Sequence, residues 1–204
     1  MKLITRQFCP LCQEDTISPF QQGTIDPTQL TADHFRITDN AYGSLWSFSR
    51  CRNCQFVFSN PTLGKSDIIQ FYANLEDSEY SDETEGRSKN FKSILKQLEK
   101  FDKPDKTLLD IGAASGIFLN LAQDFEYQSD GIEPSEYLVS IAKREFGIEL
   151  FQGTIDTFPA TKRYSVITLL DILEHLVDPV EFFNQLDPMI KTGGILVIVT
   201  PDVD

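Results

Sequence analysis

From about residue 107 onward, apolar runs alternate with amphipathic segments, which predicts strands alternating with helices. Residues 164–170 form a continuous apolar run, as expected of a parallel strand that is buried on both faces. The alternation predicts an α/β fold with a Rossmann-like parallel sheet. The expected strands are residues 107–110, 129–133, 148–151, 164–170 and 195–200, and the expected helices are residues 117–124, 136–146 and 179–190.

The first part of the chain has a different pattern, one of short strands and turns. Residues 35–37, 45–48 and 55–59 predict strands, and turn-forming residue types fill positions 39–43. This segment has too few apolar side chains to be stable alone, so a cross-link is expected.

Two helices are expected between these parts, over residues 66–75 and 87–101. Residues 76–85 contain six acids among ten residues, which is typical of a solvated linker. Tyr80 is an aromatic side chain in this stretch and a candidate lid residue. Three parts are therefore expected: a β module (1–61), a helical linker and lid (62–106) and a Rossmann-like domain (107–204).

The charge limits the classes of partner. The formal net charge is −13, and nucleic-acid surfaces depend on clustered lysine and arginine, so nucleic acid is not an expected partner. The sequence has no apolar run long enough to span a bilayer, and residues 1–6 lack the core of a signal peptide. A cytoplasmic location is therefore expected, whereas the oligomeric state is left open.

The four cysteines occur as two C-x-x-C pairs. Cys9 and Cys12 form the first pair and Cys51 and Cys54 the second, with 38 residues between the pairs. Four thiolates are the number that a tetrahedral structural zinc ion requires. Disulfides or a redox pair are the alternatives, and a cytosolic chain disfavours the disulfides.

A strand, a small-residue loop and a helix follow one another at residues 107–124, as in the first unit of a nucleotide-binding sheet. Gly112 would allow a sharp turn, and Gly116 would allow the helix to pack close to the strand. Ala114 replaces the middle glycine of the dinucleotide pattern, and its methyl group would crowd a pyrophosphate. The loop therefore favours a nucleoside cofactor without phosphates.

Acidic residues recur where strands are expected to end. Asp110 ends the first strand and Glu133 the second, and a turn at residues 153–156 follows the third. Because the carboxyl ends of neighbouring parallel strands face one crevice, these groups should converge on one ligand. An acid there can accept hydrogen bonds from both hydroxyls of a ribose, so the pattern favours nucleoside binding.

As a set, four segments resemble the class I S-adenosylmethionine-dependent methyltransferases. These segments are residues 109–116, 131–135, 173–179 and 191–196. The cysteine pairs, together with residues 56–61, are similar to the zinc-containing branch that includes sugar C-methyltransferases. The resemblance implies S-adenosylmethionine and Zn²⁺ as cofactors, and a small-molecule or nucleotide-sugar acceptor.

The resemblance also implies a role for each matching position. The methionine end of the cofactor would lie along Asp110, Gly112, Ala114 and Gly116, and the ribose would bind Glu133. The remaining positions implied near the cofactor are Thr154, Ile155 and Asp156 around the adenine, Leu170 and Asp171 at the border of the cofactor and the acceptor, and Tyr72 and Tyr80 as aromatic residues that close over the site.

His175 is the candidate general base, because an unperturbed imidazole pKa of about 6.5 suits proton removal. The alternative is that Glu174 and His175 only cap or orient the helix that follows the fourth strand. Together with Asp171 they also match an acid-x-x-acid-His arrangement of quinone O-methyltransferases, in which a divalent metal is implied.

The family's sheet has seven strands in the order 3-2-1-4-5-7-6, whereas five are expected here. The resemblance therefore implies an incomplete or shortened form whose acceptor contacts, including a Glu-His base, lie beyond Asp204. Three functions remain open: methyl transfer to a carrier-linked small molecule such as a nucleotide sugar, quinone-like O-methylation, and a non-catalytic zinc-ribbon scaffold. RNA methylation agrees less well with the charge and the cysteine spacing.

Overall fold

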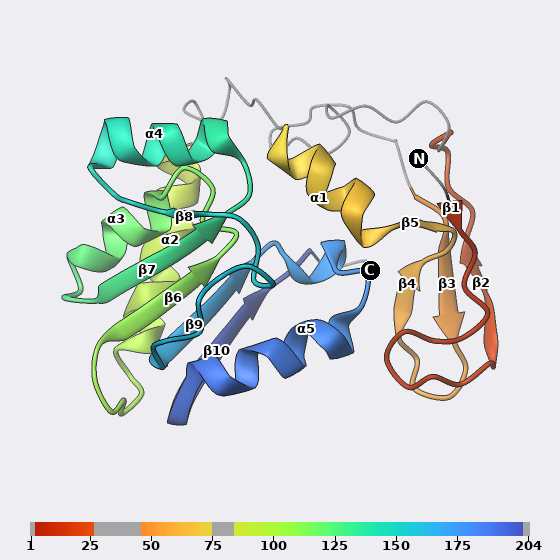
Figure 1. Ribbon diagram of the computed structural model, residues 1–204. Helices are drawn as coiled ribbons and strands as arrows, with labels where there is room; N and C mark the ends of the chain where they lie inside the picture. Colours follow the sequence, from red (N-terminus) through yellow and green to blue (C-terminus); the bar gives the residue numbers. More distant parts are fainter. Residues whose placement is uncertain (1–2, 27–45, 75–83, 202–204) are drawn as a thin grey trace.

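A computed structural model describes residues 3–26, 46–74 and 84–201 of the chain (Figure 1). The larger part of it is a five-stranded sheet in which every neighbouring pair is parallel and the order is β10-β9-β6-β7-β8. This confirms the expected α/β fold with a parallel sheet. The strands are β6 (Thr107–Ile111), β7 (Gln128–Glu133), β8 (Phe151–Gln152), β9 (Tyr164–Leu170) and β10 (Ile190–Val199).

Helices cover both faces of this sheet. Successive strand residues point to opposite faces, so Leu108 packs against α2, α3 and α4 while Leu109 packs on the side of α5. Both leucines are fully buried. The helices are α2 (Thr84–Leu98), α3 (Ile117–Gln123), α4 (Glu136–Phe146) and α5 (Pro179–Leu186), and two 3₁₀ turns are η4 (Leu173–His175) and η5 (Asp187–Met189).

The strand predicted at residues 148–151 is wrong in most of its length. Helix α4 ends at Gly147, which has a left-handed conformation with φ +69°, and the backbone N–H of Ile148 then donates to the carbonyl of Ala142. This helix-terminating hydrogen bond removes Ile148 from the ladder. Of the predicted strand, only Phe151 pairs with the sheet, as the first residue of β8.

Strand β10 begins earlier than predicted. Residues 191–194 lie between the predicted helix 179–190 and the predicted strand 195–200, but they belong to the strand and interrupt its register, which shifts between Ile190 and Ile195. Gly193 has φ +75° within this irregular stretch. The glycine pair therefore forms a bulge in the strand instead of a separate turn.

The N-terminal part contains two small antiparallel sheets. Strands β2 (Ile17–Gln21), β3 (Phe48–Cys51) and β4 (Val57–Ser59) form one sheet, in the order β2-β3-β4. The other joins β1 (Leu3–Ile4) to β5 (Thr62–Leu63), so strand pairing extends past residue 61. The predictions for residues 35–37, residues 39–43 and Tyr80 lie outside the described residues.

Helix α1 (Lys65–Ala73) lies between the N-terminal sheets and the large sheet (Figure 1). It is short, and none of its residues is fully buried. Within the described ranges, no helix is long and apolar enough to cross a membrane. The apolar side chains of α1 line a cavity.

Candidate functional site

A cavity of about 580 Å³ lies at the carboxyl ends of β6, β7 and β9, with α1 along one side. Most of the side chains predicted from the sequence line it, although they are far apart along the chain. Gly116 is not among the lining residues. The predicted residues that line the cavity are Tyr72, Asp110, Gly112, Ala114, Glu133, Thr154, Ile155, Asp156, Leu170, Asp171, Glu174 and His175.

The loop after β6 turns sharply at Gly112, as predicted. Gly112 has φ +77°, and a Cβ atom there would lie 2.2 Å from Cδ1 of Ile172. The backbone N–H groups of Gly112 and Ala113 both donate to the carbonyl of Ile132, each at 2.9 Å. The loop is thereby held against the end of β7.

Gly116 has a different role from the one predicted. It has φ +79°, and a Cβ atom there would lie 3.1 Å from Cβ of Ala142 in α4. The glycine therefore allows α3 to begin close to α4, whereas the sequence suggested close packing against the strand.

Glu133 ends β7 with only 5% of its surface exposed. Its Oε2 accepts a hydrogen bond from the backbone N–H of Ala114 at 2.9 Å, and its Oε1 accepts one from Ser135 at 2.8 Å. Burial raises the pKa of Glu133 to about 7, although the two hydrogen bonds oppose the shift. The carboxylate is thus fixed in place and retains lone pairs for a ligand.

Asp110 ends β6 and is also buried, with 2% of its surface exposed. Its Oδ1 accepts a hydrogen bond of 2.6 Å from the hydroxyl of Thr168. Burial raises the pKa of Asp110 to about 7, the hydrogen bond from Thr168 lowers it, and the charge of Glu133 adds to the rise. Thr168 was missed in the sequence analysis, although a hydroxyl inside an apolar run was a visible signal.

Asp156, which was expected near an adenine, is already hydrogen-bonded. Its Oδ1 lies 2.7 Å from Nζ of Lys65 in α1 and accepts a hydrogen bond of 2.8 Å from Gln185 in α5. Burial tends to raise the pKa of Asp156, but these contacts outweigh it and the pKa is lowered. Asp156 therefore ties α1 to α5, and Lys65 is a cavity residue that no motif indicated.

His175 also lines the cavity, on the 3₁₀ turn that follows β9. Its ring makes an edge-on contact with Tyr72, with the ring centroids 5.4 Å apart, and its Nε2 lies 3.9 Å from Oε1 of Glu174. Burial lowers the pKa of His175, although the charge of Asp171 opposes the shift. An imidazole with a lowered pKa is neutral at pH 7 and can accept a proton.

Glu174 and Asp171, which are close to His175 in the chain, also line the cavity. The hydroxyl of Thr200 donates to Oε2 of Glu174 at 3.0 Å, and burial raises the pKa of Glu174. Asp171 has φ +58°, an uncommon conformation for a residue other than glycine. Across the described parts of the chain, these acids and His175 do not form a group with metal-binding spacing.

Acidic side chains outnumber basic ones in the cavity. Among the described residues that line it, six are acids and two, Lys65 and Arg87, are permanently cationic. Arg87 comes from α2 and was also missed in the sequence analysis, because a single arginine beside an acidic stretch resembles a solvated charge. This excess of acids favours a ligand that carries positive charge, because a nearby cation would lower the raised pKa values of Asp110 and Glu133 and stabilise their charged forms.

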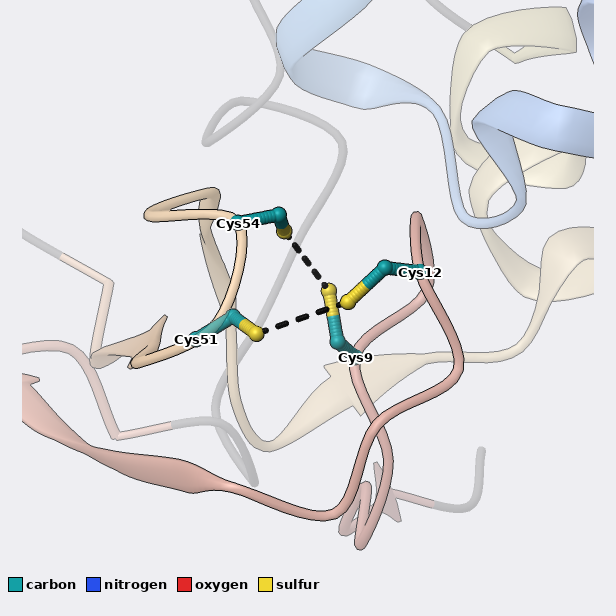
Figure 2. A group of neighbouring side chains, drawn as sticks. All are labelled: Cys9, Cys12, Cys51 and Cys54. Carbon is teal, nitrogen blue, oxygen red and sulfur yellow. Dashed lines mark hydrogen bonds between the residues drawn. The ribbon is translucent and has the colours of Figure 1, made fainter.

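The four cysteines form a separate cluster in the N-terminal part (Figure 2). Their sulfur atoms all lie within 4.8 Å of one another, with 3.6 Å from Cys9 to Cys54 and 3.5 Å from Cys12 to Cys51. A disulfide would require about 2.05 Å. Sulfurs around a tetrahedral zinc at about 2.3 Å would be roughly 3.8 Å apart, so the donor set and its spacing fit zinc.

Both cysteine pairs lie on the same kind of turn. Gln13 follows the first pair with φ +61°, and its N–H donates to the carbonyl of Cys9 at 2.9 Å. Gln55 follows the second pair with φ +64°, and its N–H donates to the carbonyl of Cys51 at 3.0 Å. Two matching turns present four thiols to one point.

Comparison with known proteins identifies a family. The sequence model of a family described as "Methyltransferase domain" matches residues 84–204, which is more than half of the chain. The ubiquinone biosynthesis O-methyltransferase of Bradyrhizobium diazoefficiens is 24% identical over 98 residues, covering 46% of this chain and 39% of that protein. The protein of the same name from Rickettsia canadensis is 28% identical over 98 residues, with 46% and 42% covered. The chain spans about two fifths of the length of these relatives.

Solved structures show the same fold. The plantazolicin methyltransferase BpumL, in complex with SAH, aligns with a TM-score of 0.52 and 22% identity, covering 64% of this chain and 56% of that one. The amino pentose methyltransferase CalS10 from Micromonospora echinaspora, with SAM bound, aligns with a TM-score of 0.50 and 21% identity, covering 62% and 58%.

Proposed function

The chain belongs to the methyltransferase domain family, and on that premise we propose that it transfers a methyl group from S-adenosylmethionine to a small-molecule acceptor. The observation that carries this proposal is the lining of the cavity, in which six acids face two permanent cations. The sulfonium and ammonium groups of S-adenosylmethionine outnumber its single carboxylate, so the cofactor carries the charge that this lining favours.

The residues at the strand ends would hold the cofactor. Glu133 is fixed by two backbone N–H groups and would accept hydrogen bonds from the ribose hydroxyls. The methionine end would lie along Asp110, Gly112 and Ala114, beside Leu170 and Asp171. Thr154, Ile155 and Asp156 would border the adenine, with Asp156 engaged by Lys65.

The cofactor supplies an electrophilic methyl carbon bonded to a positively charged sulfur. The residues of this chain would then have to align the acceptor with that carbon and take up the proton that the acceptor loses. His175 lines the cavity, and its lowered pKa keeps the imidazole unprotonated at pH 7, the form in which it would take the proton that the acceptor loses. Tyr72 packs edge-on against the imidazole and would orient it.

The relatives bear on the acceptor class. A nucleotide sugar carries two phosphate charges, which an acidic cavity disfavours. The curated relatives named above are ubiquinone biosynthesis O-methyltransferases, and this supports the small-molecule O-methyltransferase alternative. We therefore rank an uncharged small molecule above a nucleotide sugar.

We also propose that Cys9, Cys12, Cys51 and Cys54 bind one structural Zn²⁺. Four sulfur atoms within 4.8 Å of one another support this. The proposal includes the division into a zinc-binding module (1–61), a linker (62–106) and a cofactor-binding domain (107–204). In the residues that the structure describes, Asp171, Glu174 and His175 form no second metal group.

Calorimetric titration of the protein with S-adenosylhomocysteine, with ATP as a control ligand, tests the cofactor assignment. We expect S-adenosylhomocysteine to bind and ATP, whose phosphates meet the acidic lining, not to bind. Transfer of a labelled methyl group from S-adenosylmethionine to a panel of small molecules then tests activity. A folded protein that binds no S-adenosylhomocysteine would overturn the proposal and favour the zinc-ribbon scaffold.

A further inference from the structure

A second cavity of about 450 Å³ lies beside the first, between the N-terminal half of α2 and the ends of β9 and β10. Four residues line both cavities: Arg87, Phe91, Leu170 and Asp171. Because these side chains form a common wall, a molecule in one cavity lies next to a molecule in the other.

The second cavity adjoins a defined end of the cofactor site, if the proposed function holds. Glu133 and residues 154–156, which would hold the ribose and the adenine, line the first cavity only. Leu170 and Asp171, at the end of β9, line both and lie where the methionine end would be. The second cavity therefore opens where the reactive methyl carbon would be presented.

The chemistry of the second cavity differs from that of the first. Ile94 and Val199 line the second cavity but not the first, and they add to the apolar surface of Phe91 and Leu170. Arg87 and Asp171 carry opposite charges, so the lining has no excess of either sign. Such a cavity favours a largely apolar molecule with few polar groups.

Two polar side chains mark where those polar groups would bind. Asn90 offers an amide that can both donate and accept, and Asp171 offers a carboxylate that accepts. Asp171 belongs to the common wall, so a hydroxyl or amine bound there faces the first cavity. The diphosphate of a nucleotide sugar would contact a single cation, Arg87, in this lining.

We propose that the second cavity is the binding site of the methyl acceptor, and that the acceptor is an uncharged, largely apolar molecule bearing a hydroxyl or amine. This rests on the proposed function and adds the position and chemical class of the acceptor. The polar group of the acceptor contacts Asn90 and Asp171, and its apolar body contacts Phe91, Ile94 and Val199.

The test uses 2,3-dihydroxynaphthalene, an uncharged apolar diol, as the probe and UDP-glucose as the charged comparison. Calorimetry on the complex with S-adenosylhomocysteine should detect binding of the diol but not of UDP-glucose. Ile94→Trp fills the second cavity but not the first. It should weaken binding of the diol at least tenfold and leave the affinity for S-adenosylhomocysteine within twofold. Ile68→Trp, on the α1 side of the first cavity, is the matched control and should weaken S-adenosylhomocysteine instead.

Asn90→Leu adds a variant that removes the polar contact without filling the cavity, and it should weaken the diol about fivefold. Retained S-adenosylhomocysteine binding shows that each variant is folded. Three results would overturn the acceptor site: Ile94→Trp binds the diol as tightly as the wild type does, UDP-glucose binds in place of the diol, or neither probe binds. Failure of the wild-type chain to bind S-adenosylhomocysteine is a separate result, which overturns the proposed function itself.

Discussion

The guanidinium of Arg6 donates a hydrogen bond to the backbone carbonyl of Val177, which joins the N-terminal part of the chain to the wall of the cavity. The side chain of Asn60 holds the backbone of Arg6 on both sides, accepting from its N–H at 2.9 Å and donating to its carbonyl at 3.3 Å. Burial lowers the pKa of Arg6, and the charge of Asp178 opposes the shift. The cysteine cluster begins three residues later, at Cys9.

Arg6→Ala should destabilise the part of the cavity wall around Val177 without affecting the cysteine cluster. Loss of a partly buried hydrogen bond made by a charged group should lower the free energy of unfolding by about 1–3 kcal/mol. Hydrogen exchange should become faster in residues 176–182, while the metal content stays that of the wild type. Arg52→Ala, at an exposed arginine of the second cysteine turn, is the control. Unchanged exchange in residues 176–182 would show that Arg6 does not support the cavity.

Glu133→Gln should weaken cofactor binding, because an amide offers one acceptor oxygen where the carboxylate offers two. Hydrogen bonds to a charged group contribute about 1.5–3 kcal/mol each, so the affinity for S-adenosylhomocysteine should fall roughly 10- to 100-fold. Glu136→Gln removes an exposed carboxylate three residues away and should leave the affinity unchanged. Calorimetry measures both, and equal affinities would contradict the ribose-binding role.

The stability of the unliganded protein should fall as the pH rises from about 4 to 7. Burial raises the pKa of Asp110 and Glu133 to about 7, above the unfolded values of about 4. The folded state then binds these protons more tightly than the unfolded state, so the free energy of unfolding decreases between the two pKa values. Thermal melts across this range should show a smaller decrease for Glu133→Gln than for the wild type. A wild-type melting temperature that rises from pH 5 to 7 would contradict the shifted pKa values.

Removal of one cysteine should release the metal and destabilise the N-terminal part. A metal site that is not formed in the unfolded chain contributes its binding free energy to folding, so Cys51→Ser should lower stability by several kcal/mol. Metal analysis should find one zinc ion per wild-type chain and none in the variant. Asn53→Ser, within the same turn, should retain zinc. Zinc that remains bound in Cys51→Ser would exclude the cluster as the metal site.

The local sequence was sufficient for the type of fold and for the loop geometry. The alternation of apolar runs and helices predicted the parallel sheet, because strand and helix periodicity are properties of neighbouring residues. Gly112 was predicted to turn the chain and does so with φ +77°. Strand 148–151 was wrong because a backbone hydrogen bond at the end of α4 outweighed the apolar pattern.

Only the tertiary structure decided which polar groups meet. Asp110 and Thr168 are 58 residues apart and share a buried hydrogen bond, and Lys65 and Asp156 are 91 residues apart and form an ion pair. Such contacts depend on how separate elements pack, and no local spacing encodes them. The sequence by itself determined that acids stand at or near the ends of strands. The folded structure decided their environment, because burial raised the pKa values of Asp110 and Glu133 and the packing of α1 brought Lys65 to Asp156. It also placed Arg87 and Asp171 in a wall common to two cavities.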